Sequence, residues 1–154
     1  ICLRRLRPIR IENVDLESDS MEFRNPALAV DAAVRRGDEV LLIQRGNEPW
    51  KGAWALPGGF VDYGEDPREA ALRELAEETG LNGRIIRLLD AKGDPGRDPR
   101  KHIVSIVYLI EAEGEPVGAD DAADARFWPI DLVLDGELPI AGDHMEILRD
   151  WLSE

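Results

Sequence analysis

The sequence contains little of the residue types that mark several special classes of protein. Cysteine occurs once, as Cys2, which excludes an internal disulfide and favours a reducing compartment, so we predict a cytoplasmic protein. Apolar runs are all far shorter than the roughly 18 to 20 residues of a membrane-spanning helix, and we predict no membrane partner. Lysine occurs three times and the net charge is −13, so the chain lacks the basic surface that nucleic acids require. We therefore predict no nucleic-acid partner.

The length of 154 residues fits one domain with a hydrophobic core of its own. Residues 1–20 show no clear hydrophobic period and end in a polar run. We expect them to be an N-terminal extension, native or not, with an added strand as the alternative. The folded domain is expected over residues 21–154.

The stretch from Gly59 to Leu81 carries the clearest structural signals. Asp66 followed by Pro67 is typical of a helix start, and Gly80 stands where a left-handed residue closes a helix. The sequence therefore predicts a helix from about residue 67 to residue 79, with a glycine-rich segment in front of it.

Three glutamates share one side of this predicted helix. At about 100° per residue, Glu74, Glu77 and Glu78 fall within one arc, while the apolar residues fall on another side. Like charges this close destabilise an isolated helix by up to about 0.5 kcal/mol per pair. Divalent Mg²⁺ or Mn²⁺ would offset the repulsion, because hard cations prefer carboxylate oxygens. A solvated acidic face is the alternative, and Arg73 is spaced to orient the carboxylates.

The spacing of residue types from Gly59 to Leu81 favours a cation site over a solvated acidic face. The pattern G-x5-E-x7-R-E-U-x-E-E-x-G-U, in which U is aliphatic, is met at every position by Gly59, Glu65, Arg73, Glu74, Leu75, Glu77, Glu78, Gly80 and Leu81. This pattern resembles the Nudix box, and the chain is similar to Nudix hydrolases over most of residues 26–151. The resemblance implies an α/β (α+β) fold with a mixed β-sheet in an α/β/α sandwich.

The remaining pattern agrees with a mixed sheet. We expect strands over residues 27–34, 39–44, 84–91, 102–112 and 126–128, and an acidic loop over residues 119–125. Asp143 and Glu146 resemble a capping box that opens a C-terminal helix.

The resemblance also implies roles for particular residues. The box glutamates Glu74, Glu77 and Glu78 and the backbone carbonyl of Gly58 are expected to hold Mg²⁺ or Mn²⁺. Glu65 matches a supporting position. The general base is left open between a box glutamate (Glu74 or Glu77, oriented by Arg73) and an aspartate of the acidic loop (Asp120, Asp121 or Asp124).

The substrate is indicated by the segment GDPGRDPRKH. It resembles the loop of ADP-ribose pyrophosphatases, with Pro95 at the matching distance from the box. Arg97 and Arg100 are expected to contact phosphate, and pairing with Asp94 and Asp98 is the alternative. Arg45 is expected to face the diphosphate.

Aromatic residues are candidates for the nucleoside site. Trp50 and Trp54 lie in the loop that leads into the box. Trp54 is expected to line the nucleoside pocket, with a purely structural role as the alternative. The segment LPIAGDHMEIL resembles a family segment that has an aromatic residue where Gly142 stands. We expect His102 and His144 to be structural.

These features predict metal-dependent hydrolysis of ADP-ribose to AMP and ribose 5-phosphate. Two alternatives are a pyrophosphohydrolase of oxidised nucleoside triphosphates and a non-catalytic ADP-ribose sensor. A sensor would normally lack box carboxylates or carry a DNA-binding segment. The resemblance also implies a homodimer. Phe23 lies in residues 21–26, which have too few apolar residues to form a core of their own, so we expect it to help form the interface, with packing on its own domain as the alternative.

Overall fold

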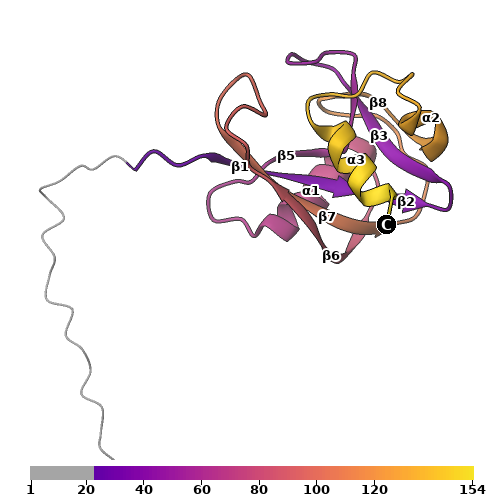
Figure 1. Ribbon diagram of the computed structural model, residues 1–154. Helices are drawn as coiled ribbons and strands as arrows, with labels where there is room; N and C mark the ends of the chain where they lie inside the picture. Colours follow the sequence, from indigo (N-terminus) through magenta and orange to yellow (C-terminus); the bar gives the residue numbers. More distant parts are fainter. Residues whose placement is uncertain (1–22) are drawn as a thin grey trace, which may run out of the picture.

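The computed structural model describes residues 23–154, so the predicted extension over residues 1–20 lies outside the described residues (Figure 1). Most of the elements are strands. In chain order they are β1 (Ala27–Ala33), β2 (Arg35–Arg36), β3 (Glu39–Arg45), β4 (Trp54–Ala55), β5 (Gly58–Phe60), α1 (Pro67–Thr79), β6 (Gly83–Lys92), β7 (Ile103–Ala112), β8 (Ala122–Pro129), α2 (Ile130–Leu134) and α3 (His144–Leu152).

The strands form two sheets. The first has the order β5-β1-β7-β6, with β1 parallel to β7 and the other pairs antiparallel. In the second, β3 lies between β8 and the short strands β2 and β4, and all its pairs are antiparallel. The expected mixed α+β class is confirmed, although the strands divide into two sheets where one was expected.

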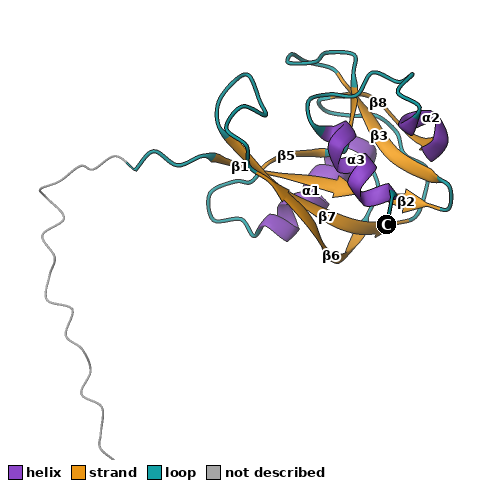
Figure 2. Ribbon diagram, viewed as in Figure 1, coloured by secondary structure: helices purple, strands orange, loops and turns teal. Residues whose placement is uncertain are grey.

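Alternation along β1 distributes its side chains between two cores. Val30 and Ala32 belong to the core cluster that includes Leu75 of α1, whereas Ala33 belongs to the cluster that includes Leu148 of α3. Successive side chains of a strand point to opposite faces. The two helices accordingly cover different faces of the first sheet (Figure 2).

Helix α1 begins and ends where its sequence signals predict. The Asp66 carboxylate accepts a hydrogen bond of 2.9 Å from the backbone N–H of Arg68, as an N-cap does. Gly80 has φ of 73°, a left-handed conformation that costs glycine little, and its N–H bonds the carbonyl of Ala76.

Several local expectations were wrong. The Asp143 carboxylate accepts no capping hydrogen bond from α3, because it accepts two hydrogen bonds from Arg97 instead. No strand was expected in the glycine-rich segment before α1, but β5 begins there at Gly58 and pairs with β1. The acidic loop is also shorter than expected, because pairing with β3 extends β8 back to Ala122.

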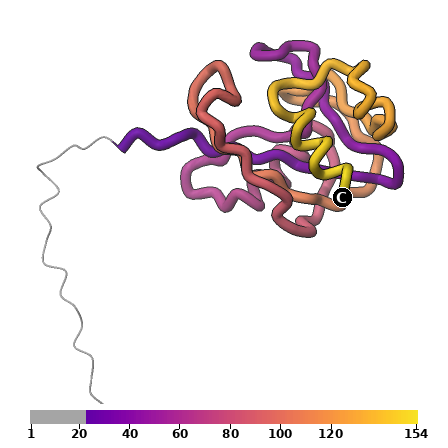
Figure 3. The backbone as a smooth tube through the Cα atoms, viewed as in Figure 1, coloured from indigo at the N-terminus to yellow at the C-terminus, as the bar shows by residue number. Residues whose placement is uncertain are grey.

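Before β1 the chain leaves the body of the domain, as the tube in Figure 3 shows. Phe23 is 80% exposed there, so residues 23–154 bury little of its ring. Among residues 23–154, the structure contains no helix with the length and apolar character needed to cross a membrane.

The packing of α1 predicts a large stability difference between two leucines. Leu75→Ala removes a fully buried side chain from between α1 and the sheet, and we expect it to lower the free energy of unfolding by about 2 to 5 kcal/mol. Leu88→Ala is the control, because Leu88 is 59% exposed on β6 and should change this energy by less than about 0.5 kcal/mol. Urea unfolding measures both, and equal losses would contradict the packing described.

Candidate active site

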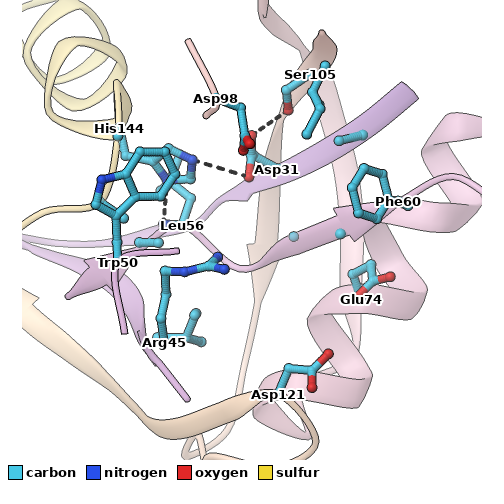
Figure 4. Close-up of a pocket in the computed structure, with 18 of the residues that line it drawn as sticks. Asp31, Arg45, Trp50, Leu56, Phe60, Glu74, Asp98, Ser105, Asp121 and His144 are labelled. Atoms are coloured by element: carbon cyan, nitrogen blue, oxygen red, sulfur yellow. Dashed lines mark hydrogen bonds and ion pairs between the residues drawn. The ribbon is translucent and has the colours of Figure 1, made fainter. Parts of the chain in front are cut away.

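A pocket of about 400 Å³ opens where the two sheets, α1 and the start of α3 meet. Its volume lies in the range typical of small-molecule sites. The lining includes box residues Gly58, Gly59, Glu74 and Glu78 together with Arg45, Arg97 and Arg100 from distant parts of the chain (Figure 4 shows several of them). The fold thus brings most of the predicted site residues into one cavity.

Two glycines allow the box helix to approach the sheet. A Cβ on Gly59 would lie 2.4 Å from the carboxylate of Glu74, and one on Gly58 would lie 2.2 Å from the carbonyl oxygen of Val30. No side chain fits at such distances. The box glycine is therefore required by the close approach of Glu74, and its neighbour by the pairing of β5 with β1.

Glu78 is the most buried of the box glutamates, at 6% exposure. Its Oε2 accepts a hydrogen bond of 3.0 Å from the backbone N–H of Gly58. Burial raises its pKa to about 8, the Gly58 hydrogen bond opposes this, and the carboxylates of Glu74, Asp31 and Asp121 raise it further. A buried carboxylate favours a positive partner, but no lysine, arginine or histidine among residues 23–154 forms an ion pair with Glu78.

Glu74 is held in place by Arg73. The guanidinium donates to Glu74 at 2.8 Å, to Glu77 at 3.2 Å and to Glu65 through two hydrogen bonds of 2.7 and 2.9 Å. Burial still raises the pKa of Glu74, although Arg73 counteracts it, whereas hydrogen bonds from Arg73 hold the pKa of Glu65 well below its usual range. Arg73 therefore holds three of the box carboxylates, those of Glu65, Glu74 and Glu77, and does not contact Glu78.

Glu77 lies apart from the pocket. Its side chain is 43% exposed and is directed to Arg73, and it does not line the cavity. Within residues 23–154, no set of three or more histidine, cysteine, aspartate or glutamate side chains is gathered so as to hold a metal ion. The predicted set of three glutamate ligands is thus not assembled by side chains alone.

The residues present nevertheless fit a hard cation. Mg²⁺ is commonly bound through one or two carboxylates, with water and substrate phosphates completing its shell. Glu74 and Glu78 supply two carboxylates beside the backbone of Gly58 and Gly59, and both are desolvated. A divalent cation there would offset the repulsion between them.

The acidic loop contributes one aspartate to the pocket. Asp121 lines it, and one oxygen of Asp121 accepts a hydrogen bond of 3.0 Å from Asn47. Asp124 is instead paired with Arg126 and, like Asp120, does not line the cavity. Position therefore distinguishes Asp121 from the other two.

The predicted arginines have different surroundings. Arg97 is 8% exposed and makes two 2.8 Å hydrogen bonds to Asp143, so Asp94 is not its partner. Arg100 pairs with Asp98, as the alternative interpretation expected, and its guanidinium lies 5.6 Å from the ring centre of Phe60. Arg45 donates to the carbonyl of Pro49 at 2.6 Å and lines the cavity.

The expectation that Trp54 lines the nucleoside pocket was wrong. Trp54 is 6% exposed in the core, where it packs edge-on against Trp128 at 5.0 Å between ring centres. Trp50 lines the pocket instead, and a Cβ on Gly142 would lie 3.1 Å from its indole. The indole therefore occupies the space beside Gly142.

Sequence reasoning did not place Asp31 or Ser105 in the site and expected His144 to be structural, but all three line the pocket. Asp31 and Ser105 are buried at 7% and 1% exposure, and the Asp31 carboxylate accepts a hydrogen bond from the Ser105 hydroxyl. A charged residue within the apolar run of residues 27–34 was the available signal, since a carboxylate is rarely buried without a partner.

Comparison with known proteins agrees with this geometry. The NUDIX domain model matches residues 25–151. The chain belongs to the Nudix family. Nudix hydrolases generally need divalent metal ions, and the match supports a hydrolase that acts on diphosphate bonds.

Nudix relatives of the chain include an ADP-ribose pyrophosphatase of Methanocaldococcus jannaschii, which is 42% identical over 84% of this chain and 75% of the relative. The ADPR responsive transcriptional repressor NtrR of Acinetobacter baylyi is 32% identical over 83% of this chain, which spans 54% of that protein. Among solved structures, the NUDIX domain of Shewanella oneidensis NrtR complexed with ADP ribose has a TM-score of 0.75 and 33% identity, covering 88% of this chain and 94% of that one.

Burial of Glu78 predicts a pH-dependent effect of Glu78→Gln on the metal-free protein. Because the pKa is about 8 in the folded state and about 4.5 when unfolded, wild-type stability falls as pH rises from the lower value to the higher. Glutamine keeps an acceptor for Gly58 but cannot ionise. In EDTA, the Tm of Glu78→Gln should therefore exceed that of the wild type by a margin that grows from pH 5 to pH 8.5.

Glu69→Gln provides the control, because Glu69 is an exposed glutamate of the same helix. The difference in Tm between Glu69→Gln and the wild type should stay constant from pH 5 to pH 8.5. Added Mg²⁺ should raise the Tm of the wild type more than that of Glu78→Gln. A margin that shrinks with pH for Glu78→Gln would contradict the burial argument.

Proposed function

We propose that the chain hydrolyses ADP-ribose to AMP and ribose 5-phosphate. The observation that carries the proposal is that one pocket is lined both by the box carboxylates of Glu74 and Glu78 and by arginines of the loop over residues 93–101. The 42% identity with an ADP-ribose pyrophosphatase supports the choice of substrate.

The proposed roles follow from position. Glu74 and Glu78 hold Mg²⁺ or Mn²⁺ together with the backbone of Gly58, and Arg73 fixes Glu74 in the required orientation. When bound, the cation polarises the diphosphate and lowers the pKa of water. Glu77 acts through Arg73, since it lies outside the pocket.

Asp121 is the proposed acceptor of the proton from the attacking water. Asn47 holds one of its oxygens, and no donor from residues 23–154 hydrogen-bonds the other. Asp121 thus faces the pocket with one fixed and one available oxygen, a geometry that suits a general base. Asp124, whose carboxylate Arg126 occupies, is assigned no proton transfer.

The diphosphate is proposed to lie along the arginines of the pocket. Arg45 and Arg100 line it and retain N–H groups beyond those bonded within the protein. Arg97 uses its Nε and Nη2 on Asp143, so its main role is to position the loop, with one nitrogen left for phosphate.

An ADP-ribose sensor is the second candidate, favoured by the 32% identity with an ADPR responsive repressor. The complete set of box carboxylates favours an enzyme, because a sensor that only binds does not require them. An enzyme of oxidised nucleoside triphosphates, which releases pyrophosphate, is supported by no particular contact.

A product assay tests the proposal. With Mg²⁺ or Mn²⁺, ADP-ribose should yield AMP and ribose 5-phosphate, and EDTA should abolish the reaction. Glu78→Gln should lower turnover by roughly 10²-fold or more, because it removes a charged ligand. The exposed variant Glu69→Gln should retain the wild-type rate.

Three outcomes separate the candidates. Binding of ADP-ribose without turnover would favour the sensor. Release of pyrophosphate from an oxidised nucleoside triphosphate, with ADP-ribose left intact, would favour the pyrophosphohydrolase of oxidised triphosphates. Near-normal activity of Glu78→Gln at low metal concentration would remove Glu78 from the proposed cation site.

We further propose a cytoplasmic homodimer in which Phe23 contributes to the interface. Its ring is 80% exposed ahead of β1, and burying such a side chain is worth about 1.5 to 3 kcal/mol. Light scattering should give a dimer for the full chain, and Phe23→Ser should shift it towards monomer. A full chain that is monomeric at assay concentrations would refute the dimer.

A further inference from the structure

Three polar side chains meet on the face of the first sheet that α3 covers. Asp31 lies on β1, Ser105 on the parallel neighbour β7, and His144 begins α3 (Figure 4). All three line the pocket, and none belongs to the box. The roles proposed above for the box and the arginines leave this group unexplained.

Asp31 presents one oxygen to the cavity. Its Oδ2 accepts the hydrogen bond of Ser105, whereas its Oδ1 receives none from residues 23–154. The closest basic atom is Nε2 of His144 at 3.7 Å, which is too long for a hydrogen bond. The side chain is only 10% exposed, Asp31 lines the pocket, and a Cβ on Gly58 would lie 2.5 Å from Oδ1. Oδ1 is therefore an acceptor at the pocket wall, beside Gly58, to which no donor among residues 23–154 is hydrogen-bonded.

His144 presents a donor beside it. The backbone N–H of Leu56 donates to Nδ1 of His144 at 3.0 Å, so Nδ1 must be the unprotonated nitrogen of the neutral ring. Nε2 then carries the hydrogen. The pocket consequently offers a donor and an acceptor 3.7 Å apart.

The pair is held in advance of binding. Asp143, adjacent to His144, is fixed by two hydrogen bonds from the buried Arg97. Burial acts to raise the pKa of Asp143, but Arg97 holds this pKa below its usual value. The Asp143 carboxylate therefore stays ionised in its pair with Arg97. Ser105 fixes Asp31, and the backbone N–H of Leu56 fixes His144, each through one hydrogen bond. Few rotamers remain to be lost when a ligand binds.

The Nε2–H donor of His144 beside the Oδ1 acceptor of Asp31 is complementary to a planar ligand edge that places an acceptor opposite His144 and a donor opposite Asp31. Adenine has such an edge, because its 6-amino group is a donor next to a ring-nitrogen acceptor. Hypoxanthine has an oxygen at that position, which would face the Asp31 carboxylate as a second acceptor. The indole of Trp50, which lies beside Gly142, provides a flat wall near the same end of the pocket.

We propose that Asp31 and His144 read the 6-amino edge of adenine and so determine the base specificity of this pocket. The inference rests on the proposed function, in that it takes the substrate to be a nucleoside diphosphate linked to ribose. Ser105, Arg97 and Asp143 are positioning residues for this pair.

The test compares ADP-ribose with inosine diphosphate ribose, which differs at the base edge alone. The wild type should prefer ADP-ribose in kcat/KM by on the order of tenfold or more, because the inosine oxygen meets the Asp31 carboxylate. Asp31→Asn keeps an oxygen for Ser105 and turns a donor towards the pocket. Its preference for adenine should fall by about tenfold or more, or reverse.

Asp98→Asn is the matched control. It makes the same chemical change at another carboxylate of the pocket, both oxygens of which are held by Arg100. Its ratio of kcat/KM for the two substrates should stay at the wild-type value even if its rates change.

Binding of both ligands to the metal-free protein, measured by calorimetry, separates this inference from the proposed function. If neither ligand is hydrolysed but the binding preference for adenine falls in Asp31→Asn, the reaction is wrong and base recognition stands. If both are hydrolysed and Asp31→Asn lowers both rates equally, Asp31 acts elsewhere and the inference is overturned. A wild type that does not distinguish the two bases overturns it as well.

Discussion

The close approach permitted by Gly58 and Gly59 is the constraint on which the site depends. Any side chain at these positions would collide with the backbone of β1 or with the carboxylate of Glu74. Because both lack a Cβ, β5 can pair with β1 while α1 lies against it. The same contact lets the Gly58 N–H reach Glu78, whose carboxylate would otherwise be buried without a hydrogen bond.

The first sheet separates the polar side chains of the site into two sets, one on each of its faces. The glutamates of α1 lie on one face, and Asp31 and Ser105 are directed to the other, where α3 supplies His144. Of the four buried polar or charged residues among residues 23–154, three line the pocket: Asp31, Glu78 and Ser105. Burial of such groups is costly, and it is commonly retained where a ligand makes use of it.

The charge of the protein is compatible with an anionic ligand only because of local arrangement. A net charge of −13 repels a diphosphate at long range. Inside the pocket, Arg45 at the end of β3 lies with Arg97 and Arg100 of the loop between β6 and β7, and Arg73 neutralises the outer box carboxylates. Glu78 and Glu74 remain for a cation, which would join protein carboxylates to substrate phosphates.

The sequence by itself determined the family, the box helix from Pro67 to Thr79 and the orienting role of Arg73. These depend on local spacing: a helix places residues three and four apart together, and its caps are formed by adjacent residues. Only the tertiary structure decided which tryptophan faces the pocket, which loop aspartate does so, and that Arg97 pairs with Asp143 rather than Asp94. It also brought Asp31, Ser105 and His144 together. Such contacts join residues far apart in the chain, and they depend on strand register and helix packing, which no local spacing specifies.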